Sequence, residues 1–182
     1  MKNQMLLCTY QSNWVTDFET IRKVIVVVLP KSDTGIEHVG STAIEGLASK
    51  PIIDIDIIYG KNTSFNSIKK GLEGLGYYHN GDQGIIGREV FKRNGIQDKH
   101  PILDVIQHHL YVCEIENQEL QRHLIFRDFL RRNEKKRKEY EKIKIEIAKR
   151  ANQDHKVYAE LKEIVATEFV ESILNSAKEM RE

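Results

Sequence analysis

The chain of 182 residues has few of the features that mark secreted, membrane-spanning or low-complexity proteins. Its longest apolar run, Val24 to Leu29, is much shorter than the ~18 residues of a candidate membrane span, and no signal-peptide pattern is present. The two cysteines, Cys8 and Cys113, are far apart and lack metal-site spacing, so we expect Cys113 to be a buried free thiol. These absences predict a soluble, cytoplasmic protein with no membrane partner.

Net charge is also nearly absent, with 28 lysines and arginines against 27 aspartates and glutamates. Such a chain has no global electrostatic attraction to nucleic acid. From Arg122 to Arg150, however, 12 basic residues stand against 5 acidic ones. On helices this excess is typical of a solvated face with i,i+4 ion pairs; the alternative is a landing surface for a triphosphate or an RNA. No RNA-binding motif accompanies it, which argues against sequence-specific RNA reading.

Two carboxylates interrupt an otherwise apolar strand pattern from Pro51 to Tyr59. They are Asp54 and Asp56, and their i,i+2 spacing places both side chains on one face, since side chains alternate along a strand. An unpaired buried carboxylate is costly, so we expect a partner, commonly a metal ion. The alternative reading is a solvated strand face.

A glycine-serine turn precedes these acids. Gly40 and Ser41 follow a short predicted strand, Ile36 to Val39, and backbone N–H groups at such a turn, with a serine hydroxyl, can hold a phosphate. Taken alone, the pair is only a turn. Combined with two acids downstream, it indicates Mg²⁺-assisted phosphoryl or nucleotidyl transfer.

The rest of the chain predicts an α+β fold. A helical stripe runs from Trp14 to Val28, although its β-branched end locally favours a strand. Further predicted elements are a helix over Phe65 to Leu75, a glycine-rich loop over Gly76 to Gly87, strands at Glu89 to Arg93 and at Ile102 to Glu114 with an interruption near Gln107, and helices from Asn117 onward.

The segments Ile36 to Ala43, Gly46 to Ala48 and Lys50 to Ile55 closely resemble the signature of the GrpB family, which is assigned to the nucleotidyltransferase-fold superfamily. The resemblance covers almost the whole chain. It implies one GrpB-like domain over 1–182, with a nucleotidyltransferase-like mixed sheet and flanking helices over 1–115 and a helical C-terminal subdomain over 116–182. Further matching positions are Tyr10, Trp14, Phe18, Gly76, Tyr77, Gly84, Gly87, Arg88, His108 to Val112, His123, Leu124, Phe126, Arg127, Asp128, Leu130, Arg131, Tyr158 and Lys162.

The resemblance also implies a function and its residues. We expect a nucleoside triphosphate to bind with Mg²⁺ and a nucleotidyl group to pass to an acceptor that is a small molecule, a protein or an RNA. Asp54 and Asp56 would bind Mg²⁺. The expected nucleotide- and phosphate-binding residues are Gly40, Ser41, Lys50, Arg88, Arg127 and Lys162. The alternative is a catalytically inactive nucleotide-binding or protein-accessory module of the same fold.

A third acid is expected on a neighbouring strand of an active nucleotidyltransferase, but His108 to Tyr111 occupies that place. His109 is then a catalytic candidate, as metal ligand or proton acceptor; its alternative is a hydrogen-bonded strand histidine. A carboxylate such as Glu89 or Asp104 beside the two acids would favour catalysis. Histidine and tyrosine alone there would favour a binding module. Oligomeric state does not follow from the sequence.

Overall fold

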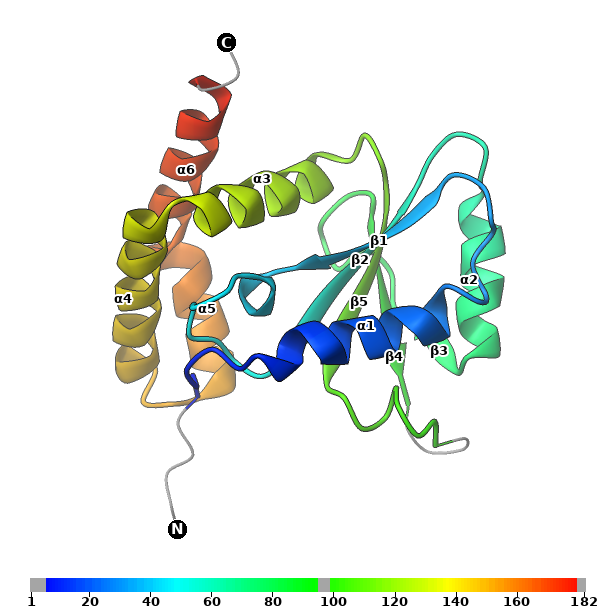
Figure 1. Cartoon of the computed structure of the whole chain (residues 1–182), viewed down its shortest axis with the longest axis horizontal. Coiled ribbons are helices and arrows are strands. Elements are labelled where there is room, and N and C mark those ends of the chain that lie inside the picture. The colour runs from blue at the N-terminus through cyan, green and yellow to red at the C-terminus, as the bar shows by residue number, and fades with distance from the viewer. Residues whose placement is uncertain (1–5, 95–98, 180–182) are drawn as a thin grey trace.

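The computed structural model describes residues 6–94 and 99–179, in which a mixed sheet packs beside a group of helices (Figure 1). This confirms the predicted α+β class. The elements are α1 (Asn13–Ile25), β1 (Thr34–Val39), η1 (Ser41–Ala43), β2 (Ile53–Tyr59), α2 (Phe65–Gly74), β3 (Tyr77–His79), β4 (Arg88–Arg93), β5 (His108–Glu114), α3 (Gln118–Arg132), α4 (Glu134–Arg150), α5 (His155–Val165) and α6 (Thr167–Glu179).

The five strands lie in the order β1-β2-β5-β4-β3. Strands β2 and β5 are parallel, whereas the other neighbouring pairs are antiparallel. The register between β2 and β5 sets Asp54 beside His109 and Asp56 beside Tyr111. Because paired residues share a face, these four side chains lie on the same face of the sheet.

The opposite face of β2 forms the main core. Ile53, Ile55 and Ile57 are 1% exposed or less and pack in one cluster with buried side chains of α1 and α2. Burying one isoleucine contributes roughly 1.5–3 kcal/mol, so this face fixes the register and points both acids the other way. The predicted helical stripe is confirmed up to Ile25; the valines that follow form no strand.

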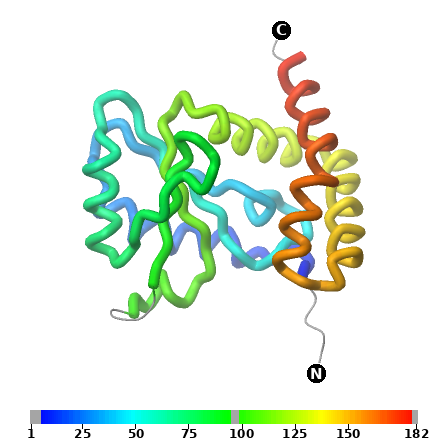
Figure 2. The backbone as a smooth tube through the Cα atoms, turned by 180° about the vertical axis from the view of Figure 1, so that it is seen from behind, coloured from blue at the N-terminus to red at the C-terminus, as the bar shows by residue number. Residues whose placement is uncertain are grey.

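A second core lies in the helical part of the chain. Helices α4, α5 and α6 pack around rings such as Tyr140 and Phe169, which stack 5.3 Å apart. Ile44 and Leu47, from the loop between η1 and β2, belong to this same core. Both views show α3 running from the sheet to these helices (Figures 1 and 2). The loop that joins the glycine-serine turn to β2 is therefore held by the helices.

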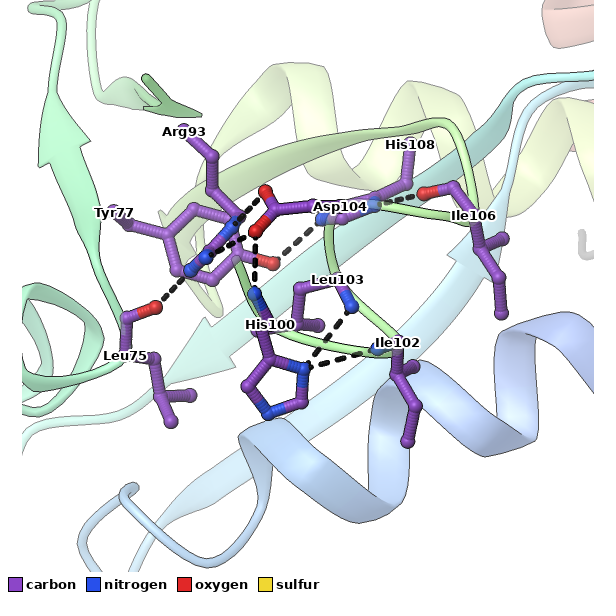
Figure 3. A network of polar contacts seen from close by, with 9 residues as sticks. All are labelled: Leu75, Tyr77, Arg93, His100, Ile102, Leu103, Asp104, Ile106 and His108. Carbon is purple, nitrogen blue, oxygen red and sulfur yellow. Dashed lines mark hydrogen bonds and ion pairs between the residues drawn. The ribbon is translucent and has the colours of Figure 1, made fainter. Parts of the chain in front are cut away.

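Of the predicted strand over Ile102 to Glu114, the part before the interruption near Gln107 is wrong. Strand β5 starts only at His108, and residues 101–106 form turns. The carboxylate of Asp104 accepts hydrogen bonds from Arg93 Nε (2.7 Å) and Nη2 (2.8 Å) and from the backbone of His100 (2.7 Å; Figure 3). These bonds fold the segment back on itself. In the described residues, no helix combines the length and apolar character needed to cross a membrane.

Candidate functional site

Asp54 and Asp56 each face an imidazole on the open side of the sheet. His109 Nδ1 lies 2.9 Å from Asp54 Oδ1, and His123 Nδ1 lies 2.8 Å from Asp56 Oδ2. The Asp54 side chain is 30% exposed, whereas Asp56 is fully buried. Its second oxygen, Oδ1, has no hydrogen-bond partner among the described residues. One carboxylate thus faces solvent, and the other keeps an unsatisfied oxygen beneath it.

The glycine-serine turn packs directly on Asp54. Gly40 has φ +70° and ψ −168°, and a Cβ at this position would lie 2.2 Å from Asp54 Oδ2. Any larger residue would therefore collide with the carboxylate, besides straining the backbone. Ser41, the next residue, begins η1. The turn is therefore in contact with Asp54, which lies 13 residues after Ser41 in the sequence.

Behind the turn, His38 is a packed, neutral residue. Its ring stacks on Phe18 with centroids 4.7 Å apart, and its Nε2 lies 3.0 Å from Thr42 Oγ1. The Thr42 hydroxyl donates to the carbonyl of Ile52, so it accepts from His38 Nε2–H. Burial is the main cause that lowers the pKa of His38 to about 4. His38 therefore holds the turn in place.

His123 is a site residue that the sequence reasoning did not select. Its Nε2 lies 3.4 Å from Glu119, so both ring nitrogens face carboxylates. Burial lowers the pKa of His123, but the hydrogen bonds and charges of Asp56 and Glu119 outweigh it and raise the pKa to about 9. The ring is therefore an imidazolium that neutralises Asp56 at pH 7. Its helical spacing could have indicated His123 as a site residue. One face of α3 carries Leu120, His123, Arg127 and Leu130, spaced three or four residues apart.

Neither candidate for a third acid lies beside the first two. Glu89 is bound to His79 at 2.5 Å and pairs in register with Val112, on the face opposite the acids. Asp104 is bound to Arg93 in the turn before β5. The neighbouring positions on β5 hold His109 and Tyr111, the residue types that the sequence reasoning linked to a binding module.

The donor set fits a magnesium ion that arrives together with a phosphate ligand. Within residues 6–94 and 99–179, no group of three or more histidine, cysteine or acidic side chains is arranged to hold a metal ion. Mg²⁺, however, is commonly bound by one or two carboxylates plus substrate phosphates and waters. Asp54 and the unsatisfied Oδ1 of Asp56 would supply those two carboxylates.

Three of the predicted phosphate-binding cations lie around this face. The Arg88 guanidinium lies over the ring of Tyr111 at 4.7 Å, and its Nε is buried without a hydrogen-bond partner in the described chain. Lys50 Nζ lies 4.5 Å from the centre of the Tyr158 ring. Lys162, on α5, is exposed and lies within electrostatic reach of Asp54. The fold thus brings Lys50 and Lys162 to the helical side of Asp54 and Arg88 to the side of β4.

The fourth cation, Arg127, is occupied by internal contacts. Its guanidinium donates to Glu37 (2.6 Å), to Asp128 (2.8 Å) and to the carbonyl of His38 (2.9 Å). The residue is 8% exposed. Arg127 therefore clamps α3 to β1, and we do not include it in the phosphate site.

A surface hollow of about 390 Å³ opens elsewhere, at the carboxyl ends of β2 and β5. Glu89, a candidate third acid, lines it, but none of the predicted catalytic, metal-binding or phosphate-binding residues does, so volume alone does not mark the candidate site. Its lining residues are Tyr59, Phe65, Gly87, Glu89, Glu114, Glu116 and Asn117.

Two curated relatives match much of this chain. Glutamate-rich protein GrpB of Alkalihalophilus pseudofirmus is 32% identical over 179 residues, which cover 96% of each chain. The UPF0157 protein YqkA of Bacillus subtilis is 30% identical over 147 residues, which cover 81% of this chain but only 40% of YqkA.

Solved structures agree with this relationship. The crystal structure of conserved protein GrpB from Enterococcus faecalis has a TM-score of 0.76 and 28% identity, covering 97% of this chain and 99% of that one. Cid1, solved in complex with its short product ApU, has a TM-score of 0.52 at 12% identity, covering 79% of this chain and 43% of its own. The second likeness concerns fold alone, and the predicted nucleotidyltransferase-like fold is confirmed at that level. Since the family model described as GrpB protein matches residues 4–175, the chain belongs to the GrpB family.

Proposed function

We propose that this protein binds a nucleoside triphosphate together with Mg²⁺ on the face of β2 and transfers its nucleotidyl group to an acceptor hydroxyl. The observation that carries the proposal is the contact between the Gly40 turn and Asp54, beside the unsatisfied oxygen of Asp56. A phosphate-sized anion at the turn and a divalent cation at the acids would satisfy both groups at once.

The residues divide this work between them. The backbone N–H groups after Gly40 and the hydroxyl of Ser41 would hold phosphate oxygens, while Asp54 and Asp56 would hold Mg²⁺. When bound, Mg²⁺ neutralises charge on the phosphates and orients them. Arg88, on β4, would add a bidentate contact to phosphate from its guanidinium, whose Nε has no hydrogen-bond partner in the described residues.

In this proposal, His109 accepts the proton of the acceptor hydroxyl. Its Nδ1–H donates to Asp54, which leaves a lone pair on Nε2, and the described residues offer that nitrogen no partner. The side chain is 54% exposed. In the proposed step the acceptor oxygen attacks the α-phosphorus in line, pyrophosphate leaves, and the hydroxyl proton passes to His109 Nε2.

A second candidate function is nucleotide binding without turnover. The observation that favours it is the identity of the neighbouring side chains on β5, where His109 and Tyr111 stand in place of a third acid. Two carboxylates bind Mg²⁺ more weakly than three, so turnover depends on His109 in the first candidate and is absent in the second.

The binding proposal is tested by calorimetric titration of ATP, GTP, CTP and UTP, with and without Mg²⁺. We expect saturable binding of at least one triphosphate that weakens at least tenfold without Mg²⁺ or in Asp54→Asn. Glu114→Gln, at the far end of β5, is the matched control and keeps the wild-type affinity. Equal affinity in Asp54→Asn and wild type would refute the assignment of that acid.

Pyrophosphate release then separates the two candidates. The triphosphate that binds is incubated with Mg²⁺ and pooled acceptors, namely nucleosides, a hydroxyl-bearing peptide and RNA oligomers. Release by the wild type but not by His109→Asn, with binding retained in both, supports transfer. Binding without release from any acceptor supports the module without turnover.

A further inference from the structure

Both acids of the candidate site have one oxygen bound to an imidazole. Asp54 Oδ1 lies 2.9 Å from His109 Nδ1, and Asp56 Oδ2 lies 2.8 Å from His123 Nδ1. An ionised carboxylate only accepts hydrogen bonds, so both imidazoles donate through Nδ1–H. The other oxygens are Oδ2 of Asp54, which faces the Gly40 turn, and Oδ1 of Asp56, which has no hydrogen-bond partner among the described residues. Each acid therefore has a single oxygen to offer to a cation.

The imidazole of His123 is held at both of its nitrogens. Its Nε2 lies 3.4 Å from a carboxylate oxygen of Glu119, one helical turn away on α3. That helix is in turn fixed to β1, because the Arg127 guanidinium donates to Glu37 at 2.6 Å. The ring therefore cannot turn away from Asp56 without losing its contact with Glu119, and Oδ2 of Asp56 stays occupied while α3 is in place.

The imidazole of His109 restricts Asp54 from within the sheet. His109 and Asp54 are paired in the register of β2 and β5, so their side chains leave neighbouring strands on the same face. The hydrogen bond between them therefore follows from the strand register itself. The side chain of His109 is 54% exposed, so this residue can be replaced without disturbing the core.

The number of free carboxylate oxygens discriminates between divalent cations. Ca²⁺ takes about 6–8 oxygen ligands and can use both oxygens of one carboxylate, whereas Mg²⁺ demands near-ideal octahedral geometry and keeps several of its waters. Binding Ca²⁺ through both oxygens of Asp54 or Asp56 would break a charge-assisted hydrogen bond to an imidazole. Mg²⁺ needs only the free oxygen of each acid, so it leaves both hydrogen bonds intact.

We propose that His109 and His123 are positioning residues that make the site select Mg²⁺, or a cation of similar size, over Ca²⁺. This selectivity rests on the proposed function, because it concerns the metal ion of that site. Each imidazole acts through the hydrogen bond that it donates to an acid. Its charge does not discriminate, since a positive charge repels both divalent cations alike.

The donated hydrogen bond can be kept or removed at each position. In His109→Asn and His123→Asn the amide Nδ2 takes the place of Nδ1, so the acid keeps its donor. His109→Ala and His123→Ala remove the donor and free the second oxygen of the acid. Arg122→Gln is the matched control for charge, because Arg122 precedes His123 on α3 and pairs with Glu119 and Glu171, not with either acid of the site.

The test measures the affinity of the whole protein for one triphosphate by calorimetry, at saturating Mg²⁺ and at saturating Ca²⁺. The probe is the α,β-methylene analogue of the triphosphate that binds most tightly in the titration above, because this analogue cannot pass on its nucleotidyl group. The wild type should bind the magnesium complex more tightly. In His109→Ala and His123→Ala we expect the ratio of the two affinities to move at least tenfold towards Ca²⁺. The two asparagine variants and Arg122→Gln should keep the wild-type ratio.

An unchanged ratio in His109→Ala would overturn the inference, and because His109 is exposed, this variant decides even if His123→Ala does not fold. An equal change in Arg122→Gln or in the asparagine variants would also overturn it, since charge or the ring itself would then be responsible. A wild type that prefers Ca²⁺ has the same meaning. All these results leave the proposed function standing, because the wild type still binds a triphosphate with its metal ion.

Failure of the proposed function has a different signature, in which the wild type binds no triphosphate. The ratio is then measured by NMR titration with Mg²⁺ and Ca²⁺ alone. A shift of at least tenfold towards Ca²⁺ in His109→Ala supports the role of the imidazoles. An unchanged ratio, or no binding of either ion, overturns it.

Discussion

At the scale of single residues, the two acids of β2 differ in their surroundings. Asp54 is open to solvent and shares a hydrogen bond with an exposed imidazole, His109. Asp56 is sealed under α3 and is neutralised by the His123 imidazolium. A cation that binds Asp56 therefore competes with a protonated histidine, whereas Asp54 is available at once. In the proposed function, this asymmetry predicts that Mg²⁺ binds more tightly when a phosphate ligand accompanies it.

The His123 imidazolium makes stability depend on alkaline pH. Its pKa is raised from an ordinary 6.5 to about 9, so the folded state holds the proton more tightly than the unfolded state. The stabilisation is complete below pH 6.5 and is lost as the pH rises to 9, by about 3 kcal/mol in all. Urea unfolding of the wild type across this range should show the loss, and His123→Gln should flatten it. Parallel curves for the two proteins would contradict the ion pair.

Also at the scale of single residues, we expect Arg127 to stabilise the fold. Arg127→Met removes hydrogen bonds to Glu37, Asp128 and the carbonyl of His38. Hydrogen bonds to charged groups contribute roughly 1.5–3 kcal/mol each, but both carboxylates are 40% exposed, so we expect a loss of only about 2–3 kcal/mol. Chemical denaturation measures it. A variant of unchanged stability that binds triphosphate at least tenfold more weakly would instead return Arg127 to the phosphate site.

At the scale of elements, the turn between β1 and η1 is shaped by its contact with β2. Gly40→Ala combines a backbone conformation that costs about 1–3 kcal/mol for other residues with a collision against the Asp54 carboxylate. Gly81 has nearly the same φ, +69°, but no heavy atom lies within 4 Å of the position its Cβ would take. It therefore provides the matched control.

The comparison separates strain from collision. We expect Gly81→Ala to lose stability but keep its affinity for the magnesium complex of the triphosphate. Gly40→Ala should lose a similar or larger amount of stability and at least tenfold in affinity, measured by thermal unfolding and calorimetry. Equal affinities in the two variants would show that Gly40 does not shape the site.

The strands also show which parts of the fold the sequence alone predicts. Alternation along β2 was enough to predict that Asp54 and Asp56 share a face, because the buried isoleucines that alternate with them leave no other register. The strand from Ile102 was predicted wrongly, since the bonds that turn it depend on Arg93, which lies on another strand. A local pattern of apolar residues gives no information about a contact with a residue on another strand.

At the scale of the whole molecule, the site depends on how α3 and the later helices cross the sheet. His123 reaches Asp56 across 67 residues, and Lys144 reaches Ala48 across 96. Sequence patterns predicted the helices but not the angle at which they cross the sheet. Neither the contact of His123 with Asp56 nor that of Lys144 with Ala48 was therefore predicted. Gly40, Ser41 and the two acids could be predicted as one group because they lie in one continuous stretch of chain.

The most direct test of a joint metal and nucleotide site is an anomalous-difference map from crystals grown with Mn²⁺ and a non-hydrolysable triphosphate. The account predicts a peak bonded to Asp54 and to Oδ1 of Asp56, with phosphates at the Gly40 turn. Crystals with Mn²⁺ alone should lack that peak. A bound triphosphate with no metal at these acids, or with its metal elsewhere, would contradict the account.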